Sequence, residues 1–140
     1  MKLKILFGLI LTTCAIFLLT AFKPQETGKI CFIRSTNSIG SMVAYKVYID
    51  DELVCNLKNK RYSTHNVTPG EHTVSVQNTG LSSHKKSRPL KITVAADKTN
   101  YLVVVNASDV YLQESVESSA QELLKRVAAT AKCLPSEDKK

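Results

Sequence analysis

Apolar and polar residues alternate along most of this chain, and the alternation predicts β-strands. In residues 42–50, Val47 and Ile49 fall in one phase while Lys46 and Asp50 fall in the other, as in a strand that buries one face. Similar short runs between turn residues predict further strands at 29–34, 52–57, 61–67, 71–77, 90–94, 101–105 and about 110–116. We therefore expect a mainly β domain, a small antiparallel β-sandwich of seven or eight strands, with an open barrel as the alternative.

Two positions carry the clearest signals for a reversal of the chain. Asp50-Asp51 separates two predicted strands, and acidic residues tolerate the left-handed backbone of a tight hairpin. Thr68-Pro69-Gly70 is the second position, since proline fixes its own φ and glycine supplies a positive φ. Further along, residues 101–105 are continuously apolar, which is typical of a central strand that is covered on both faces.

The apolar spacing changes near the C-terminus. After Ser119 the apolar residues recur every three or four positions, which predicts one C-terminal amphipathic helix at about 119–132. Ser119 and Glu122 have the spacing of a capping box at its start. The helix would lay its apolar stripe across an edge or open end of the sandwich, and we expect the charged residues 135–140 to form a disordered tail.

Residues 1–22 form a hydrophobic leader, which we expect to be a helix that directs export. Lys2 and Lys4 precede an uncharged apolar run, and such a basic head stays on the cytosolic side while the apolar part enters the membrane. The leader is either a cleaved signal peptide or a retained membrane anchor, since 18 apolar residues lie near the lower limit for a bilayer span. Lipidation of Cys14 is a third alternative, which the threonine in front of it disfavours.

The domain organisation and the location follow from this leader. We expect a short tether at 23–28, one domain at 29–134 that holds the sandwich and the helix, and the tail after it. The protein is therefore expected to be exported to the periplasm or cell envelope, either released or anchored in the membrane through the leader.

Charge changes this picture only slightly. The 140 residues include 19 Lys or Arg and 12 Asp or Glu, a net charge of +7, and without the two leader lysines 17 basic residues face 12 acidic ones. This balance does not indicate nucleic acid, which an exported domain would seldom meet. If the predicted loops share one end of the sandwich, their basic residues would form a cationic patch for an anionic envelope polymer or lipid headgroups: Lys58, Lys60, Arg61, Lys85, Lys86 and Arg88. The alternative is that these charges only keep the domain soluble.

Three cysteines follow the leader, and an oxidising compartment would allow two of them to pair. They are Cys31, Cys55 and Cys133, so three connectivities are open. We favour Cys55–Cys133, which would tie the C-terminal helix to the sheet and close a long loop; the alternative is three buried thiols. No two of these cysteines are closer than 24 positions, so their spacing predicts no metal site, and no motif predicts a cofactor.

No motif indicates an enzyme, and we expect no catalytic residue. His72 either acts as an acid or base in a pocket or, as we favour, lies at a strand end and bonds to a turn carbonyl. An enzyme that pairs His72 with Cys31 or Cys55 is one alternative, and a small ligand- or lipid-carrying barrel with a dry cavity is another. The interpretation that we favour is a non-catalytic binding or structural interaction module, with an envelope protein or an anionic envelope polymer as its partner.

Two segments resemble a known bacterial pattern. Residues 45–54 form a strand that ends in Ile-Asp and then a hairpin, and residues 67–74 contain Pro-Gly-Glu-His before the next strand. This resembles the PEGA-type domains and, more closely, a family of exported bacterial proteins, often lipoproteins, that is catalogued as a domain of unknown function. Arg34 stands where that family has an early arginine at the end of its first strand. The resemblance covers about 29–116 and implies a β-sandwich-like module in the cell envelope without an established activity.

Overall fold

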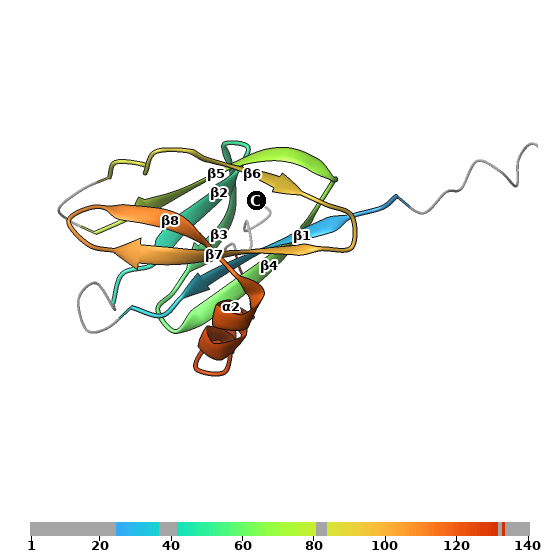
Figure 1. The fold of residues 1–140 in the computed structure, drawn as a ribbon. Helices are drawn as coiled ribbons and strands as arrows, with labels where there is room; N and C mark the ends of the chain where they lie inside the picture. Colours follow the sequence, from blue (N-terminus) through green and yellow to red (C-terminus); the bar gives the residue numbers. More distant parts are fainter. Residues whose placement is uncertain (1–24, 37–41, 81–83, 132, 134–140) are drawn as a thin grey trace, which may run out of the picture.

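Two β-sheets and one short helix make up the structure, a computed structural model that describes residues 25–36, 42–80, 84–131 and 133 (Figure 1). The predicted leader at 1–22, the first part of the tether and the predicted tail at 135–140 lie outside the described residues. Within the described part of the chain, no helix combines the length and apolar character that crossing a membrane requires.

The strands follow one another closely because turn residues separate short β-forming runs. In chain order the elements are β1 (Gly28–Arg34), β2 (Tyr45–Ile49), β3 (Glu52–Leu57), β4 (Arg61–Val67), β5 (Gly70–Asn78), β6 (Leu90–Val94), β7 (Thr99–Asn106), β8 (Val110–Ser115), α2 (Glu117–Leu124) and β9 (Ala128–Ala129). The mainly β class is confirmed, and β1 to β8 lie within a few residues of the predicted strands. The sequence does not predict β9.

The strands form two sheets of different character. One sheet has the order β8-β7-β1-β4-β9 and the other the order β3-β2-β5-β6. The four-stranded sheet is antiparallel, but in the five-stranded sheet β1 runs parallel to β7, and β4 runs parallel to β9. The expectation of a purely antiparallel fold is therefore wrong. The physical reason is the long connection: between β1 and β7 the chain forms β4 and the whole four-stranded sheet. A connection of that length can return in either direction, unlike a two-residue hairpin.

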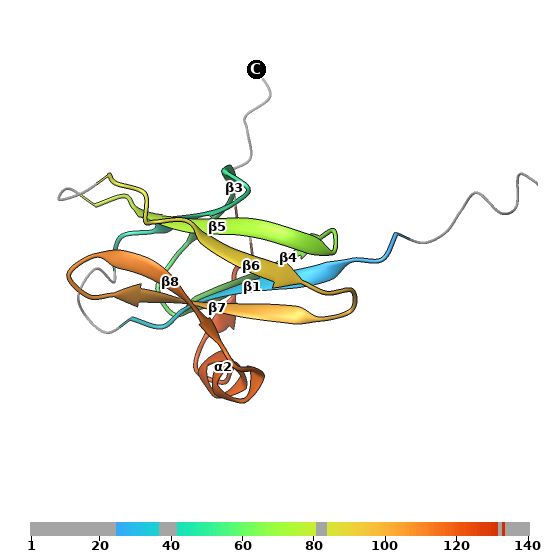
Figure 2. The same cartoon turned by 45° about the horizontal axis from the view of Figure 1, so that its top comes forward.

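The two sheets face each other across one apolar core (Figure 2). Both sheets contribute, because alternate residues of each strand point to the same face. Phe32 of β1, Val47 of β2, Val74 of β5 and Leu102 of β7 are fully buried there. Side chains thus occupy the space between the sheets in which a carrier barrel would need a dry cavity.

The C-terminal helix is shorter than the sequence predicts. α2 begins at Glu117 and ends at Leu124 in place of about 119–132, and no side chain caps its first turn, so the predicted capping box does not form. The chain then turns into β9, where the N–H of Ala128 donates to the carbonyl of Lys60 at 3.1 Å. Pairing with the edge of β4 thus overrides the helical spacing of these residues.

α2 covers part of the outer face of the five-stranded sheet (Figure 1). Ala120 is fully buried against Cys31 and Ile33 of β1 in a second, smaller apolar cluster. Tyr101 of β7 packs against this cluster, whereas Leu102 faces the main core. Both faces of β7 are therefore at least partly covered, as its apolar run predicts.

Candidate functional site

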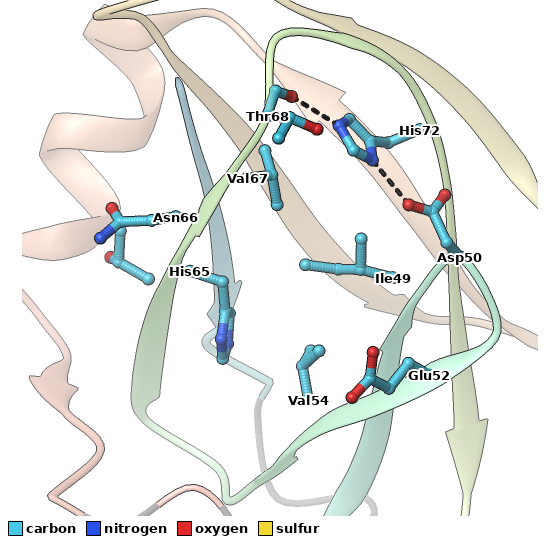
Figure 3. Close-up of a pocket in the computed structure, with 10 residues that line it drawn as sticks. Ile49, Asp50, Glu52, Val54, His65, Asn66, Val67, Thr68 and His72 are labelled. Atoms are coloured by element: carbon cyan, nitrogen blue, oxygen red, sulfur yellow. Dashed lines mark hydrogen bonds and ion pairs between the residues drawn. The ribbon is translucent and has the colours of Figure 1, made fainter. Parts of the chain in front are cut away.

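An open cleft of about 460 Å³ lies where β3 of one sheet comes next to β4 of the other (Figure 3). Residues 64–68, which are the end of β4 and the turn after it, line one side. The β2–β3 hairpin and His72 of β5 line the other side. The cleft therefore depends on how the two sheets are placed against each other, as well as on local sequence.

Apolar side chains lie in the middle of the cleft and acidic groups lie at its rim (Figure 3). Ile49, Val54 and Val67 provide the apolar contacts, and all three pack against the main core. Asp50 and Glu52 are exposed, and they come from the hairpin turn and the first residue of β3. The cleft thus offers apolar area next to negative charge.

A β-bulge places Val54 in this position. Val47 pairs with Cys55 and Tyr48 pairs with Leu53, so Val54 is an extra residue without a partner in β2. A bulge of this kind bends the strand and increases its twist. β3 therefore deviates from regular pairing at the point where it borders the cleft.

β4 presents an open edge to the cleft. The carbonyl of Tyr62 accepts a hydrogen bond from the N–H of Thr130, just after β9, at 2.8 Å. Because backbone groups alternate between the two sides of a strand, the N–H and C=O groups of Thr64 and Asn66 point to this same side. β9 pairs only with Arg61 and Tyr62, and no backbone hydrogen bond among the described residues occupies the groups of Thr64 and Asn66. This part of the edge can accept another strand.

Three residues, which we call the His72 clamp, close one end of the cleft: Asp50, Thr68 and His72 (Figure 3). Asp50 has φ 50°, as expected for the predicted tight turn. Its carboxylate accepts the N–H of Thr73 at 2.8 Å and lies 2.7 Å from Nδ1 of His72. Nε2 of His72 lies 2.7 Å from the carbonyl of Thr68. The prediction that His72 bonds to a turn carbonyl is confirmed.

The His72 clamp fixes the charge of its members. Both ring nitrogens of His72 face acceptors, and only the imidazolium form has a proton on each nitrogen. The bonds to the Thr68 carbonyl and the Asp50 carboxylate raise the pKa of His72. The Thr73 amide, and after it His72, lower the pKa of Asp50. In this arrangement His72 has no unoccupied nitrogen with which to act as a base.

A disulfide lies beside His65, which lines the cleft away from the His72 clamp. It joins Cys55 to Cys133, the pair that the sequence analysis favours. The sequence predicts that this bridge ties the C-terminal helix to the sheet, but it ties down the segment after β9 instead. There the carbonyl of Cys133 accepts a hydrogen bond from the N–H of Asn56 at 2.8 Å. His65 lies next to this disulfide, and burial lowers the pKa of its ring. Sequence separation gave no reason to expect this histidine beside the two cysteines.

The basic residues of the predicted cationic patch fall into two groups. Lys58, Lys60 and Arg61 lie in or beside the β3–β4 turn, and Lys85, Lys86 and Arg88 lie in the connection from β5 to β6. Leu57, just before the first group, and Asn78, where the second connection starts, both pair with Tyr45, so the two groups lie at the same end of the four-stranded sheet. Within that end they lie toward its two outer strands, β3 and β6. Nζ of Lys86 lies 3.1 Å from a carboxylate oxygen of Asp51 and 3.9 Å from the ring centroid of Tyr48, so this lysine already has an intramolecular partner.

His72 does not come together with Cys31 or Cys55, the two cysteines that a catalytic pair would need. Cys31 packs under α2 on the outer face of the five-stranded sheet, where burial raises the pKa of its thiol. Cys55 is bonded to Cys133, and His72 lies in the clamp on the other sheet. Neither cysteine is available to His72 as a nucleophile.

Comparison with known proteins identifies a family whose function is unknown. A family model described as "Protein of unknown function (DUF2846)" matches residues 24–122. No curated protein matches the sequence. The matched region contains both walls of the cleft and the His72 clamp, whereas Cys133 lies beyond it.

Proposed function

We propose that this protein, which belongs to the DUF2846 family of proteins of unknown function, is a non-catalytic binding domain. We propose also that it is exported to the cell envelope. Its partner is an envelope protein that inserts an extended segment into the cleft. The observation that carries this proposal is the open part of the β4 edge at Thr64 and Asn66, which lines the cleft and has no backbone partner on that side among the described residues.

Export is supported by three features. The leader combines Lys2 and Lys4 with an uncharged apolar run. The Cys55–Cys133 disulfide suits an oxidising compartment. The resemblance to exported bacterial domains, including lipoproteins and PEGA-type modules, points the same way. In this proposal the two sheets form a β-sandwich outside the cytoplasm, either released by cleavage or held at the membrane by the leader.

Strand addition is the binding mode that the cleft supports. An extended segment that joins an exposed sheet edge gains backbone hydrogen bonds, and pockets for its alternate side chains give specificity. Here the edge groups of Thr64 and Asn66 would bond to the incoming backbone. Ile49 and Val54 lie within reach of the side chains that point into the cleft.

The rim favours a partner segment in which basic and apolar side chains alternate. Glu52 brings a carboxylate to the cleft although the chain as a whole is basic, whereas the charge of Asp50 is already paired with His72. An anionic polymer would have to bind away from the cleft, because the two groups of basic residues lie at the Tyr45 end of the four-stranded sheet and the cleft lies at its Ile49 end. A protein segment therefore fits the described residues better than an anionic polymer, and better than a lipid, for which the filled core leaves little room.

Two substitutions at Asn66 test the strand-addition mode. Asn66→Pro removes the N–H that an added strand would use, and proline is tolerated at an edge whose N–H faces outward. Asn66→Ala keeps the N–H and is the matched control. From a displayed library of random peptides, we expect the full-length protein to select segments with Lys or Arg between apolar residues. Their affinity should fall about tenfold in Asn66→Pro, the equivalent of one or two hydrogen bonds, and stay within about twofold in Asn66→Ala.

Three results would contradict the proposal. Equal peptide binding by the two folded Asn66 variants would exclude strand addition. Selection of acidic peptides, or unchanged binding in Glu52→Lys, would exclude the charge preference. Recovery of the protein from the cytosol of its source cells, with its cysteines reduced, would exclude export.

A further inference from the structure

Three side chains that commonly bind metals meet beside the cleft, away from the His72 clamp. Cys55 lies in β3, His65 lies in β4 and Cys133 follows β9. One sulfur or ring nitrogen of each lies within 4.8 Å of the others. We call these residues the Cys55–His65–Cys133 cluster.

Neighbouring groups hold the cluster in addition to the sulfur–sulfur bond. The backbone carbonyl of Cys133 accepts a hydrogen bond from β3 at 2.8 Å. Nε2 of His65 lies 3.1 Å from Oγ of Ser63, and the His65 ring stands edge-on to Phe32 with 5.9 Å between the ring centroids. Opening the disulfide would therefore leave the backbone and the imidazole with other contacts that keep the three ligands close.

The cluster has the composition of a zinc site. Two thiolates and one imidazole are a known set of three protein ligands for Zn²⁺, with the fourth position left to water or substrate. Bonds of 2.0–2.3 Å in a tetrahedron put neighbouring ligand atoms about 3.6 Å apart, so ligands within 4.8 Å need only small side-chain rotations. Soft thiolates also disfavour Mg²⁺ and Ca²⁺.

We propose that the reduced protein binds one Zn²⁺ at the Cys55–His65–Cys133 cluster. The ligands are the two thiolates and a ring nitrogen of His65, and a water that enters through the cleft occupies the fourth position. His65 lines the cleft, so solvent has a route to the metal. The site opens into the cleft proposed for the protein segment, but the metal-site proposal does not depend on the binding of that segment.

A dithiol supplies the two electrons that convert the disulfide into the two thiols of the metal site. The dithiol attacks Sγ of Cys133, which is partly exposed, whereas Cys55 is fully buried. The two thiols of the reductant become a disulfide, and their two electrons and two protons convert the protein disulfide into two thiols. Zn²⁺ then displaces one proton from each thiol, and both protons pass to solvent. A metal bridge thus replaces a covalent bridge between the same two segments.

Cobalt substitution tests the site. The full-length protein in mild detergent is reduced with dithiothreitol, freed of it under anaerobic conditions and titrated with Co²⁺. We expect a thiolate-to-cobalt absorption band in the near ultraviolet at one equivalent, its loss when Zn²⁺ is added, and release of two protons per Zn²⁺. His65→Ala should weaken Zn²⁺ binding at least about 100-fold, since loss of a ligand costs at least as much as loss of an outer-shell partner. His84→Ala and Cys31→Ala should bind as the wild type does.

Several outcomes would overturn the proposal. They are the absence of a thiolate band in the reduced wild type, an equal band in the disulfide form, unchanged affinity in His65→Ala, and loss of the band in Cys31→Ala. If reduction unfolds the chain, Zn²⁺ should restore its β circular dichroism, and failure to do so would also overturn the proposal. Peptide binding by the oxidised protein is measured separately, so either proposal can fail without the other.

Discussion

At the scale of single residues, His72 connects the stability of the fold to pH. Its pKa is raised above the ordinary value of 6.5, so its stabilising contribution is complete below pH 6.5 and is lost as the pH rises through the raised value. The pKa of Asp50 is lowered from 3.8, so its contribution is complete above pH 3.8 and is lost as the pH falls through the lowered value. The His72 clamp is therefore complete between about pH 4 and pH 6.5.

A neutral substitute for His72 should reveal this window. His72→Gln can still donate one hydrogen bond but cannot carry the charge. We therefore expect its largest loss of melting temperature between pH 4 and 6.5, and a smaller loss once the pH has risen through the raised pKa of His72. Melting curves from pH 3 to pH 9 would measure the difference from the wild type. His84→Gln, at an exposed position, is the control and should show no such dependence. A loss in His72→Gln that does not vary with pH would contradict the charged clamp.

Arg34 is a buried cation whose partners are backbone carbonyls and an aromatic ring. It is fully buried, its Nη1 donates to the carbonyls of Val43 at 2.6 Å and Leu57 at 2.9 Å, and its guanidinium lies 3.6 Å from the ring centroid of Tyr45. Burial lowers its pKa, but an arginine remains charged. The side chain therefore links the end of β1 to two segments of the other sheet.

Truncation of Arg34 should be among the more damaging single substitutions. Arg34→Ala leaves a cavity and two carbonyls without their donor, so we expect a loss of about 3 kcal/mol in the free energy of unfolding. Arg34→Lys keeps the charge and can keep one bond, so it should lose less. Urea denaturation measures both, and the exposed Arg88→Ala should stay within about 0.5 kcal/mol of the wild type. An equally small effect of Arg34→Ala would show that these bonds do not stabilise the fold.

At the scale of elements, the sequence predicts what local patterns control. The sequence predicts β1 to β8 because the alternation of a strand, and a turn such as Asp50-Asp51, each depend on only a few neighbouring residues. The segment 125–132 is the exception. Its spacing favours a helix, but Ala128 pairs with Arg61 of β4, 67 residues earlier in the sequence, and this pairing prevails in β9. The parallel pairing of β1 with β7 was missed for the same reason.

The pairing of β9 can be tested with two neighbouring alanines, both exposed. Ala128→Pro removes the N–H that donates to Lys60, whereas Ala129→Pro removes an N–H on the opposite side of the strand. We expect Ala128→Pro to lower the free energy of unfolding by about 1 kcal/mol more than Ala129→Pro, the value of one backbone hydrogen bond. Urea denaturation of both variants measures this, and equal losses would contradict the described register.

At the scale of the whole molecule, the cleft arises where the two sheets meet, which is why only part of it could be predicted. The sequence predicts the bond of His72 to a turn carbonyl because Thr68 and His72 are only four residues apart. The open edge of β4, the position of His65 and the neighbourhood of Asp50 and Glu52 depend on sheet order and on the path of the chain after α2. No pattern within a few residues encodes that path.

The Cys55–Cys133 disulfide holds the chain after β9, which belongs to the five-stranded sheet, against β3 of the other sheet. The two cysteines are 78 residues apart in the sequence. A loop of that length corresponds to about 4.5 kcal/mol in the chain-entropy account, and measured values for native disulfides are typically about 2–4 kcal/mol. We therefore expect the double variant Cys55→Ala, Cys133→Ala to lose about 2–4 kcal/mol in urea denaturation.

A reductant should destabilise the wild type and the Cys31→Ala control by a similar amount and leave the double variant unchanged, because Cys31 is a separate thiol under α2. The His72 clamp should still form in the double variant, since its three members lie in β5 and two turns that the disulfide does not join. The pH dependence of stability that the His72 clamp causes should then remain, while the free energy of unfolding falls at every pH. If reduction left the wild type as stable as before, the two sheets would not need the C-terminal segment to hold them together at this edge.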